Sequence, residues 1–482
     1  MLTASSETSE PGDSDVLLRQ LKDALPAASL IDSTDGLQTY QTDMLRNKQA
    51  RPLAAIAPAS TAELSAALRI CARFKTVIVP FGGNSGFCGG SMTDTSATQI
   101  VISLHRMNQI REVDLLNNTA TVEAGCILAN VQELASEHDR CFPLSHGGEG
   151  SAQIGGCLST NAGGNAVLRY GMAKDLVLGL EVVLPNGDIL NVLRGLRKDN
   201  AGYDLKQLFL GTEGTLGIIT AAVIKLYPKP KFTETALVAV PSPAAAVRLL
   251  ALLRGELGEV ISACEMLPRT GIDLALTVID PQPEPFDQPY AWQVLLELET
   301  SSRYFQLRQA LEEALTQAME SGLANDAMLA TSERQRLALW KLREGIALAA
   351  ISDPSSLKND QSVPCSKIPE FIRKANAAIQ NLTPDARVVP FGHIGDGNIH
   401  CNVWRPLNMQ AQAFVDQWPA LVQALETVAT ELGGSIAAEH GIGSSKRAAL
   451  ARVKDPISIE LMQAVKQAID PGNRLNPGKV VP

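Results

Sequence analysis

The amino-acid sequence predicts an α+β protein with two domains and a helical C-terminal segment. Short β-branched runs separated by glycine-rich loops fill the first half of the chain, which indicates many short strands. After residue 228 the pattern of apolar residues changes. Apolar strand-like runs then alternate with long amphipathic segments, which is typical of an antiparallel sheet covered by helices. The expected divisions are a disordered tail over 1–14, a first domain over 15–230, a second domain over 231–435, and a segment over 436–482 that returns to the first domain.

In the first domain, apolar periodicity predicts a helix over 15–25 and another over 60–74, with Ser60 or Thr61 as its N-cap. Strands are expected at 76–79, 99–104 and 120–125, and over 179–190. Within the last of these, the sequence Pro-Asn-Gly-Asp at 185–188 predicts a hairpin turn, because glycine and asparagine tolerate the backbone angles that a tight turn needs.

The second domain is expected to begin after the linker "YPKPKF" at 227–232, in which two prolines disfavour regular structure. Strands are predicted at 235–240 and 291–299, and a helix is predicted over 303–322. The last sixty or so residues are mostly helical in pattern.

Composition excludes several function classes. The chain of 482 residues has a net charge of −9 and only 4% aromatic residues, which argues against nucleic-acid binding. None of the eight cysteines forms a C-x-x-C pair, so an iron–sulfur cluster or a cysteine zinc knuckle is not expected. The scattered cysteines favour a reducing compartment.

The N-terminal stretch is polar and acidic and matches neither a secretory signal nor a transit peptide. No apolar run is long enough to predict a transmembrane segment. We therefore expect a cytoplasmic protein whose only membrane association is peripheral, and a homodimer is compatible with the sequence.

Three glycine-rich stretches stand beside predicted strands: "PFGGNSGFCGG" at 80–90, "GGEGSAQIGGCLSTNAGG" at 147–164 and "FLGTEGTLGIIT" at 209–220. Successive backbone N–H groups in such loops form concave anion sites, and glycine lets phosphate oxygens approach the main chain. One such stretch alone would favour a tight turn in a β-rich domain. Three of them favour a large phosphate-bearing cofactor.

Neither G-x-G-x-x-G after a strand nor the P-loop pattern occurs, so a nicotinamide dinucleotide or ATP held in the common ways is not expected. The three stretches closely resemble the FAD-binding domain of the vanillyl-alcohol-oxidase superfamily, over about residues 50 to 228. The resemblance implies two groups of FAD contacts. Those at the pyrophosphate would be Pro80, Gly82, Gly83, Asn84, Ser85 and Gly86. Those along the rest of the cofactor would be Gly147, Gly156, Ser159, Asn161, Gly164, Ile219 and Asn476. Asn84 and Ser85 stand where some relatives carry a linking histidine, which implies non-covalent FAD.

Three of the six histidines occur in two glycine-framed motifs, "FGHIGDGNIHCNVW" at 391–404 and "AAEHGIGSSKR" at 437–447. Strand alternation places His400 and Asn402 on one face, and the turn before them lets His393 fold back toward His400. Two histidines and the carboxylate of Glu439 are a common ligand set for a divalent metal. The alternative is that the histidines are hydrogen-bonded core residues and that Glu439 pairs with a neighbouring basic residue.

Both motifs resemble the C-terminal domain of the FAD-linked D-2-hydroxyacid dehydrogenases. That resemblance implies that His393, His400 and Glu439 bind zinc or a similar divalent cation. It further implies that His440 is the catalytic base and that Asn402 contacts the substrate.

Two basic residues, Arg343 and Lys358, are assigned a function only through this resemblance. On sequence alone, Arg343 and Lys358 would be solvated surface charges. In members that oxidise dicarboxylates, the matching residues hold the distal carboxylate. A threonine expected one helical turn after the arginine is Ala347 here, which departs from that pattern.

The function predicted from these features is FAD-dependent oxidation of a D-2-hydroxy acid to the 2-oxo acid, with D-2-hydroxyglutarate favoured over D-malate and D-lactate. Hydride would pass to flavin N5, and the electrons would leave to an electron-transfer flavoprotein or a quinone. The alternatives are a zinc hydrolase and a non-catalytic flavin-binding subunit of a larger complex. Flavin colour would exclude the first, and bleaching by substrate would exclude the second.

Overall fold

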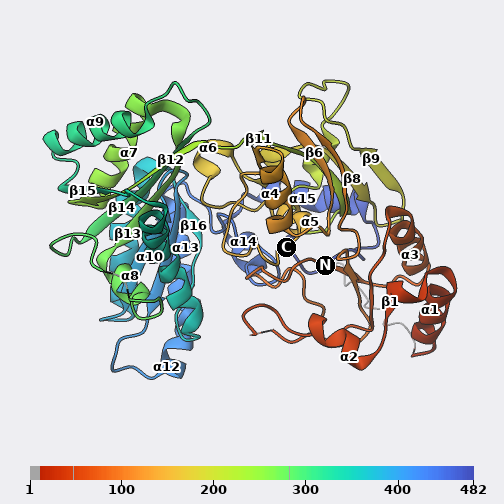
Figure 1. Cartoon of the computed structure of the whole chain (residues 1–482). Coiled ribbons are helices and arrows are strands. Elements are labelled where there is room, and N and C mark those ends of the chain that lie inside the picture. The colour runs from red at the N-terminus through yellow and green to blue at the C-terminus, as the bar shows by residue number, and fades with distance from the viewer. Residues whose placement is uncertain (1–10, 47, 282) are drawn as a thin grey trace.

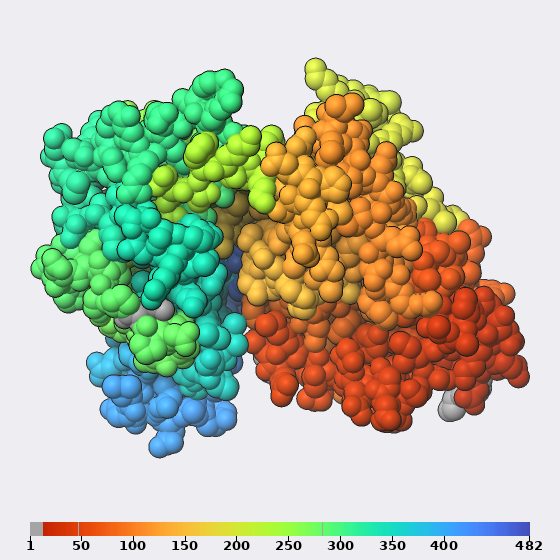
Figure 2. Space-filling model, viewed as in Figure 1, coloured from red at the N-terminus to blue at the C-terminus, as the bar shows by residue number. Residues whose placement is uncertain are grey.

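The computed structural model describes residues 11–46, 48–281 and 283–482, which form two lobes that lie side by side (Figure 1). The first lobe carries the N-terminal half of the chain, and the second carries the segment from β12 (Phe232–Val240) to α13 (Trp418–Glu431). Figure 2 shows that the surface is hollowed along the boundary between the lobes.

The first lobe contains a four-stranded sheet with the order β1-β2-β4-β3. Its strands are β1 (Leu30–Ile31), β2 (Ala54–Ile56), β3 (Ile78–Phe81) and β4 (Ile100–Ser103). Strands β2, β4 and β3 run parallel, because α3 (Thr61–Arg73) carries the chain back between β2 and β3. The hydroxyl of Ser60 accepts a hydrogen bond from the Glu63 N–H at 3.2 Å, which confirms Ser60 as the N-cap of this helix.

A second, five-stranded antiparallel sheet has the order β5-β6-β10-β8-β9. Its strands are β5 (Ile110–Asp114), β6 (Thr119–Glu123), β8 (Val177–Val183), β9 (Ile189–Val192) and β10 (Ile218–Lys225). The predicted turn joins β8 and β9, and Gly187 adopts φ +86° there. A side pair joins β7 (Arg140–Cys141) to β11 (Tyr227–Pro228), so the start of the expected linker is a short strand.

Helices complete the first lobe. They are α1 (Pro11–Ala24), α2 (Thr34–Leu37), α4 (Leu128–Glu137), α5 (Ile154–Thr160) and α6 (Val167–Tyr170). Short 3-10 turns in the chain lie at Ala27–Ser29, Gln38–Tyr40, Ala173–Leu176, Leu205–Leu208, Gly258–Val260 and Cys365–Lys367. Residues 11–14, which were expected in the tail, belong to α1, because proline fits a first helical turn and Asp13 favours the helix dipole. The rest of the predicted tail lies outside the described residues.

The second lobe is a seven-stranded antiparallel sheet with the order β15-β12-β14-β13-β17-β18-β16. Besides β12, its strands are β13 (Ile261–Pro268), β14 (Trp292–Thr300), β15 (Asp326–Leu329), β16 (Gln361–Ser362), β17 (Arg387–His393) and β18 (Asn398–Trp404). Alternation along β12 sends Val238 into one core and Leu237 into another, so both faces of the sheet are buried.

Different helices cover the two faces of this sheet. The face that includes Val238 packs against α7 (Pro243–Leu257), α9 (Leu307–Glu320), α11 (Ile368–Leu382) and α13. The face that includes Leu237 packs against α8 (Arg269–Ala275) and α10 (Glu333–Ser352). A short helix, α12 (Ala411–Val415), precedes α13.

The last part of the chain contacts the first lobe through α14 (Arg447–Val453) and α15 (Pro456–Ile469) and the residues that follow them. Leu475 pairs with Ile78 of β3 in a parallel bridge, and the Asn476 N–H donates to the Ile78 carbonyl at 2.7 Å. Across the described ranges, every helix is too short or too polar to traverse a lipid bilayer.

Candidate active site

The three glycine-rich stretches converge in the first lobe. A β-carbon added at Gly82 would lie 3.6 Å from the Gly156 Cα, and one added at Gly214 would lie 2.8 Å from the Pro80 side chain. The Glu213 N–H donates to the Ser159 carbonyl at 2.7 Å. Segments that are far apart in sequence therefore form one glycine-lined surface.

Some of these glycines are required by backbone packing. A β-carbon at Gly83 would meet the Ser151 carbonyl oxygen at 1.8 Å, and one at Gly164 would meet the Ser145 oxygen at 1.9 Å. At Gly86, Gly147 and Gly156 an added β-carbon meets no atom within 4 Å. These open backbone faces fit a bound FAD, because they leave room for phosphate and ring atoms to approach the main chain.

Three asparagines at this surface adopt the left-handed conformation, namely Asn84 at φ +53°, Asn161 at +50° and Asn476 at +48°. The amide of Asn84 donates to the Thr42 carbonyl at 3.0 Å, and the Asn161 Oδ1 accepts the Lys174 N–H at 2.9 Å. Their side chains thus fix loops rather than point into open space.

The Asn476 amide nitrogen donates to the carbonyls of Gly90 and Glu213, at 3.0 and 2.7 Å. Its Oδ1 is buried and accepts no hydrogen bond from the described residues, so a ligand donor fits there. Ser85 lies against Gly148 in the second stretch, and Ile219 is a buried residue of β10.

Flavin attachment can be tested directly. We expect acid precipitation of the purified protein to release all flavin into the supernatant, since the family resemblance places Asn84 and Ser85 where some relatives carry a linking histidine. The nearby His146 ring is engaged at both nitrogens, because Nδ1 accepts the Gly148 N–H at 3.1 Å and Nε2 lies 3.6 Å from the Cys157 sulfur. Absorbance of supernatant and pellet at the flavin bands is the measurement, and a yellow pellet would contradict the prediction.

The second lobe places its histidines on neighbouring strands. His393 ends β17 and His400 lies within β18, and their ring centroids are 5.6 Å apart. The tight turn between the strands includes Gly397 at φ +88°. The loop after α13 then places the His440 ring 5.7 Å from the His400 ring, in a stacked arrangement.

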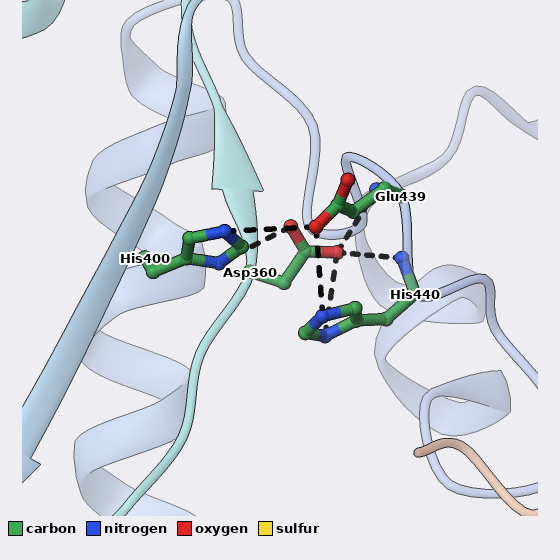
Figure 3. A group of neighbouring side chains, drawn as sticks. All are labelled: Asp360, His400, Glu439 and His440. Carbon is green, nitrogen blue, oxygen red and sulfur yellow. Dashed lines mark hydrogen bonds and ion pairs between the residues drawn. The ribbon is translucent and has the colours of Figure 1, made fainter. Parts of the chain in front are cut away.

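Two imidazoles face one carboxylate oxygen in this cluster (Figure 3). The Glu439 Oε1 lies 3.6 Å from the His400 Nε2 and 3.9 Å from the His440 Nε2. With Asp360, these side chains offer four ligand atoms that all lie within 4.8 Å of one another. Burial lowers the pKa of His400 to about 4, so its imidazole is neutral, as a metal ligand must be.

His393 lies to one side of this group. Its Nδ1 is 2.6 Å from the Glu265 Oε1, and its Nε2 is 3.2 Å from an Arg343 guanidinium nitrogen. Burial disfavours its protonation, but the Glu265 carboxylate outweighs burial and raises the pKa of His393 to about 9. The structure therefore brings together His400 and Glu439 from the predicted metal set and places His393 in a charged triad with Glu265 and Arg343.

Arg343 lies on α10 and is buried, not solvated. Its Nε donates to the Glu265 Oε2 at 2.8 Å, and its guanidinium lies 5.5 Å from the Phe391 ring centroid. Arg343 is therefore not a free cation awaiting a substrate carboxylate, because the fully buried carboxylate of Glu265 already neutralises it.

Within the described part of the chain, Lys358 has only neutral oxygens within hydrogen-bond distance. Its Nζ donates to the Ser356 carbonyl at 3.1 Å and the Ser356 hydroxyl at 3.0 Å, with the Asp353 carbonyl at 3.4 Å. Burial lowers the pKa of this half-buried lysine. The Asn402 Oδ1 accepts the N–H of Asn359 at 2.9 Å, so this predicted substrate contact also holds the segment that carries Lys358.

Three carboxylates of the site were not among the predicted residues. Glu265 is fully buried in β13, and Asp360 is fully buried just before β16. Glu213, in the third glycine stretch, accepts the N–H groups of Ile442 and Gly443 at 2.7 and 2.9 Å. Glu213 thereby ties the loop after His440 to the first lobe. For Glu265, the sequence offers one indication, an acidic residue within an otherwise apolar strand.

Each of the two lobes matches a known protein family. Residues 52–193 match the family described as FAD binding domain, and residues 229–480 match the family described as FAD linked oxidases, C-terminal domain. The FAD expected from the glycine stretches is therefore confirmed at the level of the domain.

Similar proteins cover nearly the whole chain. The mitochondrial D-2-hydroxyglutarate dehydrogenase of Rattus norvegicus is 37% identical, and the match covers 94% of this chain and 82% of that protein. D-2-hydroxyglutarate dehydrogenase of Stutzerimonas stutzeri (strain A1501) is 33% identical, with 96% and 98% covered. Among solved structures, p-cresol methylhydroxylase with substrate bound superposes with a TM-score of 0.78 at 17% identity, over 98% of both chains.

These matches settle the fold and the family together. The structural likeness confirms the vanillyl-alcohol-oxidase type of fold, and the alkyldihydroxyacetonephosphate synthase structure agrees, with a TM-score of 0.71 at 18% identity over 99% of this chain and 86% of that one. The chain belongs to the FAD-linked oxidase family and is an FAD-dependent D-2-hydroxyacid dehydrogenase of the vanillyl-alcohol-oxidase superfamily.

Proposed function

We propose that the protein oxidises D-2-hydroxyglutarate to the 2-oxo acid with the help of a divalent cation. The observation that carries the proposal is the convergence of the His400 and His440 Nε2 atoms on the Glu439 carboxylate, in a loop tied to the glycine-lined lobe through Glu213. Relatives named D-2-hydroxyglutarate dehydrogenase, similar over almost the entire chain, support the choice of substrate.

The donor set fits a divalent cation. A neutral imidazole and a carboxylate suit zinc and similar ions, and the buried setting of His400 keeps its imidazole unprotonated. His400 and Glu439 would hold the ion. His393, the third predicted ligand, would join them only after losing the proton that Glu265 stabilises. A cation bound there would lower the pKa of a coordinated hydroxyl.

His440 would take the proton of the substrate hydroxyl. Its ring is less buried than that of His400 and packs edge-on against Phe87 of the first glycine stretch, with ring centroids 4.8 Å apart. The base thus lies where the two lobes meet, which suits proton removal beside a flavin. Bound FAD would accept the hydride from C2 of the substrate, and an electron-transfer flavoprotein or a quinone would then take the electrons.

The distal carboxylate of the substrate would pair with Lys358. This lysine has no acidic hydrogen-bond partner among the described residues, whereas Arg343 is already paired with Glu265. A buried ammonium without an anion is costly, and a second substrate carboxylate removes that cost. Arg343 would contribute by holding His393 in place, with its guanidinium shared between Glu265 and the substrate.

Lys358→Met is the test of this substrate choice. We expect kcat/KM for D-2-hydroxyglutarate to fall about 100-fold, as is typical when one partner of a desolvated charge pair is lost. The value for D-lactate, which has no second carboxylate, should change less than about threefold. The measurement is steady-state oxidation of both substrates with an artificial electron acceptor.

Lys341→Met is the matched control, because Lys341 is exposed on α10 and should leave both substrates unchanged. Equal losses for the two substrates in Lys358→Met would reject Lys358 as the carboxylate-binding residue. Failure of every D-2-hydroxy acid to bleach the flavin of the unmodified protein would instead favour a non-catalytic subunit.

A further inference from the structure

A single buried carboxylate organises the loop that carries the proposed base. Asp360 is 0% exposed and lies between Lys358 and β16. Its Oδ2 accepts three successive backbone N–H groups, from Ala438, Glu439 and His440, at 3.1, 3.0 and 2.9 Å. This arrangement closes the loop around one oxygen atom, as backbone N–H groups do around an anion.

The other oxygen of Asp360 is also engaged. Oδ1 accepts a hydrogen bond from the Asn398 amide at 2.9 Å. Although Asp360 belongs to the group whose atoms could reach a metal, its two oxygens already serve four N–H donors. Asp360 is therefore placed to hold protein N–H groups in position, and it has little capacity left to coordinate a metal ion.

The His440 ring turns its Nδ1 toward this carboxylate. The ring Nδ1 lies 3.7 Å from the Asp360 Oδ2, while the Nε2 faces Glu439 at 3.9 Å. Figure 3 shows Asp360 between the rings of His400 and His440. The His400 Nδ1 likewise faces the Asp360 Oδ1, at 4.0 Å. A carboxylate on the Nδ1 side favours the tautomer that carries its proton there and leaves Nε2 free.

We propose that Asp360 is a positioning residue for His440. It fixes the backbone of residues 438–440, holds the imidazole with Nδ1 toward itself, and leaves Nε2 to take the substrate hydroxyl proton. The inference rests on the proposed function, because it requires His440 to be the base.

A double-mutant cycle of Asp360→Asn and His440→Asn tests the proposal in the full-length holoenzyme. We expect Asp360→Asn to lower kcat for D-2-hydroxyglutarate by about 100-fold or more, with KM changed less than about threefold. Flavin absorbance and metal content per chain should stay at the levels of the unmodified protein. The double variant should be no slower than His440→Asn alone, because a residue that acts through the base has no effect once the base is gone.

Asp326→Asn is the matched control. This aspartate also accepts a backbone N–H, from Ala327 at 2.8 Å, and a side-chain hydroxyl, from Tyr290, but it lies in β15 at the opposite edge of the sheet. Its kcat should equal that of the unmodified protein.

Three results would overturn the assignment. They are a kcat within threefold of normal in Asp360→Asn, losses that multiply in the double variant, and loss of metal together with turnover. If Asp360→Asn does not retain flavin, Asp360→Glu replaces it in the cycle under the same criteria. Absence of activity in the unmodified protein is a separate result, since it would reject the proposed function itself.

Discussion

Replacing His440 with asparagine is expected to lower kcat for D-2-hydroxyglutarate by about 100- to 10,000-fold, the range that general bases contribute. Asparagine has a similar volume and can hydrogen-bond, but it cannot take a proton at neutral pH. The backbone N–H of residue 440 would still donate to Asp360, so the loop should keep its shape. Stopped-flow reduction of the flavin isolates this step from electron transfer to the acceptor.

The same substitution at His105 provides the control. His105 lies in the first lobe, where its Nδ1 is 3.1 Å from the Ser103 hydroxyl. We expect His105→Asn to reduce flavin at the normal rate. Normal flavin reduction by His440→Asn would show that another group removes the hydroxyl proton.

Removal of the metal is expected to have an effect of similar size. His400→Ala and Glu439→Gln should each lose the bound cation and lower turnover by at least about 100-fold. Without the cation, the pKa of the substrate hydroxyl would no longer be lowered. Prolonged chelation of the unmodified protein should reproduce the loss, and added zinc or manganese should restore activity only in the unmodified protein. Metal content by mass spectrometry and the flavin spectrum are measured on the same samples.

His138→Ala is the control for losing a histidine side chain away from the site, since His138 follows α4 in the first lobe and its Nδ1 lies 3.0 Å from the Leu134 carbonyl. His393→Ala is expected to lose metal as well, although its ring now pairs with Glu265. Normal turnover by the metal-free protein, with flavin retained, would exclude a role for a cation.

What the sequence could predict was mostly local. Ser60 as an N-cap, the hairpin turn at 185–188 and the glycine-rich loops each depend on residues within a few positions of one another. Local hydrogen-bond capacity and backbone freedom are properties of short segments, so a pattern in the sequence reveals them.

The partners of the charged residues were not predictable in this way. Glu265 and Arg343 are 78 positions apart, and Asp360 meets the N–H groups of residues 438–440 from about 80 positions away. No periodicity relates such residues, because the sheet order, not the chain order, brings them together. Arg343 therefore resembled a solvated helix charge until the strand beside it was known.

Because Leu475 pairs beside β3 and Asn476 holds the first glycine loop, the flavin-binding lobe is complete only after these late residues have been synthesised. The second lobe has no such delay, since its sheet is built from one continuous stretch of chain, and domains generally fold as they emerge. The later-translated second lobe can therefore fold before the first lobe is complete, and the cofactor surface of the first lobe is complete only once residues 475 and 476 have joined it.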